Sequence, residues 1–122
     1  VPRADSLYLS DLAVEMPHVL MCFRDDKAFR VEFAGAEVQD LLGFDPTGEL
    51  LTQRDPVAIL AGVARGIKQA VKRQGPELTR GIGWSAIELP FFKTRNHISV
   101  FLIGLVATRL GAPAEVLEFR AR

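Results

Sequence analysis

Cysteine and histidine are scarce in this sequence, and their scarcity removes several kinds of site. Cys22 is the single cysteine, so no disulfide can form within the chain, and a reducing, cytoplasmic compartment is expected. His18 and Cys22 stand four residues apart, but two ligands do not make a metal site. His97 and Ser99 lack the surrounding sequence that a nucleophile elbow needs. We therefore assign no metal ligand and no catalytic residue, and we expect a protein that is not an enzyme.

Excess charge and long apolar runs are also missing. The 15 basic and 15 acidic residues leave a formal net charge of +0, which provides no attraction toward phosphate backbones or anionic lipids. The longest apolar run, 98–107, is far shorter than the roughly 20 residues of a membrane-spanning helix. Direct binding of nucleic acid and a membrane span are therefore not expected.

The run from Ile98 to Ala107 is the strongest structural signal that is present. It holds one polar side chain, Ser99, and no charged one, and its content of Ile, Val and Phe favours a strand over a helix. A strand that is apolar on both faces belongs in the middle of a sheet. An aspartate at Val100 or at Phe101 is therefore expected to unfold the domain.

Two shorter strands are predicted near the start of the chain and two more before the central run. Segments 18–24 and 28–34 flank a polar trio, Asp25 to Lys27, that suits a tight hairpin turn. Alternating apolar residues then recur over 78–84 and 86–93. With 48% hydrophobic and 25% charged residues among 122, these strands fit one globular domain.

Helices are predicted between the two pairs of strands and at the N-terminus. A short helix that includes Val38 should end at Gly43 in a left-handed cap. A long helix should begin at Asp55–Pro56 and stop at Gly75–Pro76. A further helix is expected over 9–16.

This order of elements predicts an α+β fold. We expect a five-stranded antiparallel sheet in the order 2-1-5-4-3, with the last strand in the middle, helices on one face and an N-terminal helix. The single domain 1–122 would consist of an N-terminal helical cap (1–17), a core (18–109) and a C-terminal tail (110–122).

The same order of elements resembles a PAS domain. The run from Arg30 to Gly48, RVEFAGAEVQDLLGFDPTG, is similar to a pattern found in a group of compact bacterial PAS proteins. Pro2 to Asp5 upstream and Glu88 to Phe91 downstream also resemble that group. The resemblance covers nearly the whole chain and implies a sensory or regulatory module in bacterial signalling, with an effector protein or domain as a possible partner.

The resemblance also allows tests for cofactors. Flavin photosensors of this fold carry a reactive cysteine in the helical insertion, whereas 36–43 contains none. Haem-binding relatives commonly use a histidine from the long helix, and 55–74 has none. Flavin-adduct chemistry is therefore excluded and haem is not expected, but the sequence leaves the cofactor unknown.

Small residues recur along one side of the long helix. They are spaced four apart, although an interior glycine costs about 1 kcal/mol of helix stability relative to alanine. Either the sheet packs directly on this stripe, or the stripe borders a pocket for a small apolar ligand. The stripe consists of Ala58, Gly62, Gly66 and Ala70. For the pocket, the predicted ligand-binding residues are Met21, Phe23, Gly62, Gly66, Trp84 and Phe91.

Two functions remain open at this stage. The first is a sensor that binds a small apolar ligand or a protein partner. The alternative is a PAS fold with a filled core that serves only for dimerisation. In both cases a homodimer is expected, because the outer face of the sheet is apolar and the segment from Leu7 to Met16 could cover it or exchange between subunits.

Overall fold

The sheet and its helices have the predicted arrangement. The computed structural model describes residues 16–94 and 97–108, so most of the predicted N-terminal cap and the whole of the predicted C-terminal tail lie outside the described residues. The described elements are β1 (Val19–Asp25), β2 (Ala28–Ala34), α2 (Ala36–Leu42), α3 (Ala58–Arg73), β3 (Glu77–Gly81), β4 (Trp84–Thr94) and β5 (His97–Ala107). The five strands form one antiparallel sheet in the order β2-β1-β5-β4-β3, which confirms the predicted α+β topology.

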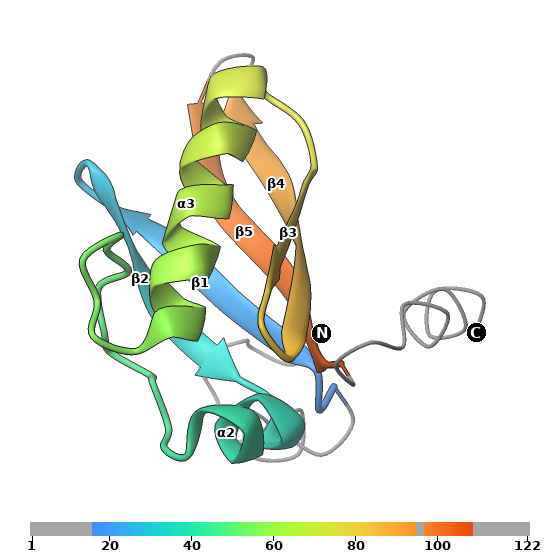
Figure 1. The fold of residues 1–122 in the computed structure, drawn as a ribbon. Coiled ribbons are helices and arrows are strands. Elements are labelled where there is room, and N and C mark those ends of the chain that lie inside the picture. The colour runs from blue at the N-terminus through green and yellow to red at the C-terminus, as the bar shows by residue number, and fades with distance from the viewer. Residues whose placement is uncertain (1–15, 95–96, 109–122) are drawn as a thin grey trace.

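Strand β5 is central, because it pairs with β1 on one side and with β4 on the other. Its residues Phe101, Ile103 and Leu105 are buried on the face toward the helices. Phe101 meets Phe29 of β2 edge to face, with ring centroids 5.1 Å apart. Figure 1 shows α3 lying across this face of the sheet. The hydrophobic core therefore lies between α3 and the central strands.

Local sequence explains the turns that join these elements. Asp26 adopts a positive φ of 60° in the β1–β2 hairpin, which aspartate tolerates better than most residues. Gly43 has a φ of 86° after α2, and its N–H donates to the carbonyl of Gln39 at 2.8 Å. The hairpin turn and the glycine cap are thus confirmed.

The long helix α3 begins later than predicted and ends where its sequence predicts. It begins at Ala58, three residues after Asp55, because Asp55 instead accepts a 2.8 Å hydrogen bond from the N–H of Val57 in a turn ahead of the helix. At its other end Gln74, rather than a glycine, takes the left-handed conformation with a φ of 56°. The N–H of Gly75 then donates to the carbonyl of Ala70 at 3.2 Å. The predicted start was three residues too early, whereas the helix itself and its end just before Gly75 are confirmed.

The loop between α2 and α3 is attached to the free edge of β2. The N–H groups of Val31 and Leu51 donate to the carbonyls of Glu49 and Phe29, both at 2.9 Å. The Arg30 side chain adds a hydrogen bond to the carbonyl of Gly48 at 2.6 Å. These bonds protect an open sheet edge and hold the loop against the hairpin.

Candidate functional site

The six residues predicted to bind a ligand lie on two sides of the sheet. Gly62, Gly66 and Trp84 belong to the interface between α3 and the sheet. Side chains alternate between faces along a strand, so Met21 and Phe23 lie opposite the buried Leu20 and Cys22. Strand pairing places Phe91 in the same row of the sheet as Phe23, with Val100 between them. The structure therefore does not bring the six residues together, and their role in binding stays a prediction.

On the helix side, Gly62 allows Trp84 to pack directly against α3. A Cβ atom added at Gly62 would collide with the six-membered ring of the Trp84 indole. Trp84 is itself 5% exposed, so the ring occupies the space that a larger residue at position 62 would need. At this part of the small-residue stripe, the gain is close contact with the sheet.

Gly66, one turn further along, admits a carboxyl group instead of a ring. A Cβ atom there would collide with the Thr79 hydroxyl and the Glu88 carboxyl. The Thr79 hydroxyl donates to Oε1 of Glu88 at 2.8 Å, whereas Oε2 has no hydrogen-bond partner among the described residues. The side chain of Glu88 is fully buried. Sequence reasoning missed this residue, because alternation along β4 alone does not show which face lies under the helix.

Burial is the main reason that the pKa of Glu88 rises from 4.5 to about 8. The hydrogen bond from Thr79 lowers the pKa, and the nearby Glu77 raises it again. Glu77 is the direct neighbour of Glu88 across the β3–β4 pair. Its Oε1 lies 3.4 Å from the Arg73 guanidinium, an ion pair rather than a hydrogen bond. At neutral pH the carboxyl of Glu88 is therefore mainly protonated.

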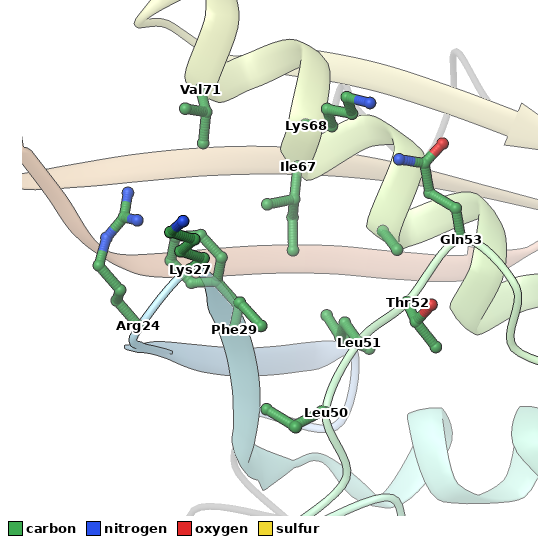
Figure 2. A pocket seen from close by; sticks show the side chains of 12 residues that line it. Arg24, Lys27, Phe29, Leu50, Leu51, Thr52, Gln53, Ile67, Lys68 and Val71 are labelled. Atoms are coloured by element: carbon green, nitrogen blue, oxygen red, sulfur yellow. The ribbon is translucent and has the colours of Figure 1, made fainter.

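A cleft opens beside this packed interface, between α3, the β1–β2 hairpin and the loop that follows α2 (Figure 2). Its volume is about 510 Å³, within the usual range for small-molecule sites. The edge bonds of β2 position the loop that forms one of its walls. The cleft is lined by Arg24, Lys27, Ala28, Phe29, Leu50, Leu51, Thr52, Gln53, Ala64, Ile67, Lys68 and Val71.

The charged side chains of the cleft are all basic. Arg24 and Lys27 come from the hairpin, and Lys68 comes from α3 on the opposite side. Arg24 is held in place, because its Nε donates to the carbonyl of Ile98 at 2.7 Å and its guanidinium lies 4.9 Å from the centre of the Phe29 ring. None of the six predicted ligand residues lines this cleft. The apolar pair Leu50–Leu51, in the loop between α2 and α3, is the sequence signal that could have indicated this cleft.

The other side of the sheet, which we call the outer face, is apolar over its three central strands. Pairing aligns Phe23, Val100 and Phe91 in one row and Met21, Leu102 and Leu89 in the next. Phe23 is 43% exposed and Phe91 is 48% exposed. Large apolar side chains gathered in this way are typical of a contact surface.

Cys22, which was considered above with His18 as a metal ligand, is a free cysteine enclosed in the fold. Cys22 is buried, and burial followed by the charge of Glu32 raises the pKa of its thiol far above the usual range. Such a thiol is not a nucleophile at neutral pH. Residues 16–94 and 97–108 contain no group of three histidine, cysteine, aspartate or glutamate side chains placed to hold a metal ion. No helix within these ranges has the length and apolar character to cross a bilayer.

Comparison with known proteins gives no assignment: no protein-family model matches the chain, and no curated protein matches it significantly in sequence.

Proposed function

We propose that the chain is a non-enzymatic, PAS-like regulatory module of bacterial signalling that pairs with a second copy of itself through the outer face of its sheet. The observation that carries this proposal is the apolar outer face. Fully burying one large apolar side chain is worth about 1.5–3 kcal/mol, so the exposed parts of Phe23, Phe91 and Ile87 offer a clear gain on association.

A second copy suits this face for two reasons. In a symmetric dimer the same patch meets itself, and a patch of apolar side chains is complementary to itself without any pairing of charges. In addition, the segment from Leu7 to Met16 is separated from β1 by two residues in the sequence, and the outer side of β1 carries Met21 and Phe23. We propose that this segment lies at the dimer interface, as a cover or as an exchanged element.

Light scattering coupled to size exclusion tests the proposal. The whole chain should be a dimer, and Phe91→Glu should be a monomer that keeps its fold, because position 91 is half exposed in one copy. Ile82→Glu is the matched control, since Ile82 is 86% exposed in the β3–β4 turn, away from the outer face. It should remain a dimer. A whole chain that is monomeric at all concentrations would overturn the proposal, as would a dimeric Phe91→Glu variant.

The cleft favours a second candidate function, which is the sensing of a small molecule. Its volume and its apolar walls support this role, and a ligand between the hairpin and α3 would contact both parts of the domain. Native mass spectrometry of the purified protein provides the test. A stoichiometric small molecule supports sensing, whereas a mass equal to that of the chain alone leaves dimerisation as the function.

A further inference from the structure

We infer that the cleft binds a small amphipathic acid, that is, a molecule with an apolar body and one anionic head group. The inference rests on the sensing function proposed second above, and it adds the chemical class of the ligand. It draws on the shape of the cleft, the sign of its charges and the partners of its basic side chains.

The apolar body has a suitable surface in the lower part of the cleft. Phe29 of β2, Leu51 of the loop and Ile67 of α3 come from three separate segments and contribute apolar side chains to one hollow (Figure 2). All three are buried residues of the domain core, so their positions do not depend on a ligand. A rigid apolar surface of this kind binds without the cost of ordering it first.

The head group must be anionic because of the charges around the cleft. Arg24, Lys27 and Lys68 line it, and no acidic side chain does. This local excess contrasts with the formal net charge of +0 for the whole chain. A neutral ligand would remove water from these cations and offer nothing in return, whereas a carboxylate would form charge-assisted hydrogen bonds.

The basic side chains are available for such bonds. Among the described residues, no hydrogen bond or ion pair involves the ammonium group of Lys27 or Lys68. Arg24 uses its Nε for the carbonyl of Ile98, and its two terminal amino groups have no partner within the same part of the chain. Because Arg24 is already fixed against Phe29, it can receive an anion with little loss of side-chain freedom.

The test compares three probes with the same ten-carbon chain and different head groups: decanoate, decanol and decylammonium. Isothermal titration calorimetry on the whole chain measures their affinities, below the micelle concentrations of decanoate and decylammonium and below the solubility limit of decanol. We expect decanoate to bind about tenfold more tightly than decanol, as two or three partly exposed charge pairs would provide. Decylammonium should bind most weakly.

Matched variants locate the effect. Lys27 and Lys68 are exposed, so the double variant Lys27→Gln/Lys68→Gln should fold normally and lose most of the preference for decanoate over decanol. Lys72→Gln removes the same charge from the exposed side of the same helix, outside the cleft, and should keep the preference. Gln53→Glu places a carboxylate at the cleft and should weaken the binding of decanoate.

The outcomes separate this inference from the functions on which it depends. Equal affinities for decanoate and decanol would overturn the anionic head group and leave an apolar sensor standing. A preference for decanoate that survives in the double variant would overturn the placement of the head group beside Lys27 and Lys68. Absence of binding by all three probes would overturn the inference, whereas the sensing function is decided by the native mass spectrometry described above. Light scattering on the same samples reports the dimer separately, because neither lysine lies on the outer face.

Discussion

The two faces of the sheet differ in how completely their side chains are packed. On the face under α3, glycines allow a tryptophan ring and a glutamate carboxyl to come within contact of the helix. On the outer face, Phe23 and Phe91 are almost half exposed. The strands that form the two faces are the same, so the difference comes from what covers each face.

This contrast separates the structural role of a residue from its possible role in recognition. Where Gly62 and Gly66 face the sheet, the helix side is filled, and its interior has little tolerance for a change of volume or charge. The outer face and the cleft keep apolar surface that one copy of the domain leaves partly uncovered. Interaction is therefore expected at these two places, and stability is expected to depend on the helix side.

The largest effect should come from an aspartate placed on the helix side of the central strand. Phe101→Asp puts an unpaired carboxylate at a fully buried position, at a cost on the order of the whole stability of ~5–15 kcal/mol, and should unfold the domain. Val100, the preceding residue, points to the outer face and is half-buried, so Val100→Asp makes the same change on the other side of the strand. It should keep the fold with a lower melting temperature and lose the proposed dimer.

Circular dichroism melts and light scattering on the two variants measure these outcomes. The sequence alone predicts that both variants unfold the domain. A difference in stability between them would therefore show that the two faces of β5 are covered differently. Phe101→Leu is the control for the site and should retain a cooperative melting transition. If Val100→Asp unfolds as completely as Phe101→Asp, the two faces are equally closed and the contrast is wrong.

A smaller effect should appear as a pH dependence that originates from Glu88. The pKa of this carboxyl is about 8 in the folded state and near 4.5 in the unfolded chain, so between these pH values the folded state binds the extra proton. Stability from this group is fully present below pH 4.5 and is lost as pH rises through 8. The loss is on the order of a few kcal/mol. Urea denaturation at pH 5, 7 and 9 measures it.

Two glutamine variants isolate the contribution of Glu88 to the change of unfolding free energy with pH. Glu88→Gln keeps the shape of the side chain without the charge, so its stability should change much less between pH 5 and 9 than that of the wild type. Glu37→Gln makes the same change on the exposed surface of α2 and should retain the wild-type dependence. A wild-type slope that persists in Glu88→Gln would assign the pH dependence to other groups.

Sequence pattern was enough for the fold, because the strongest signals in the chain are local. The apolar run of β5 placed it in the centre of the sheet, and the polar turn at 25–27 and the glycine at position 43 marked where β1 and α2 end. The start of α3 was placed too early, since an aspartate followed by proline serves a turn as well as a helix cap.

The candidate sites were harder to predict, because they depend on contacts between distant segments. Alternation showed that Met21 and Phe91 each lie on one face of a strand, but not that this face is the one opposite α3. The cleft exists because backbone bonds hold Leu51 and its neighbours along β2, and no side-chain pattern encodes those bonds. Glu88 looks like an ordinary surface glutamate until Gly66 is placed above it.

The smallest effect compares the same substitution, glycine to alanine, on the two faces. At Gly62 the added methyl group would collide with the Trp84 ring, which is enclosed and cannot move away, so we expect a loss of about 1–3 kcal/mol despite the better helix propensity of alanine. At Gly104 of β5, the nearest described atom would be Cγ2 of Ile87 at 3.3 Å. Ile87 is 40% exposed and can shift, so Gly104→Ala should be neutral or stabilise by about 0.5 kcal/mol through the unfolded state. Urea denaturation of both variants and of Gly75→Ala, where no described atom lies within 4 Å of the new Cβ, measures the difference. Equal losses at positions 62 and 104 would mean that the outer face is packed as tightly as the face under α3.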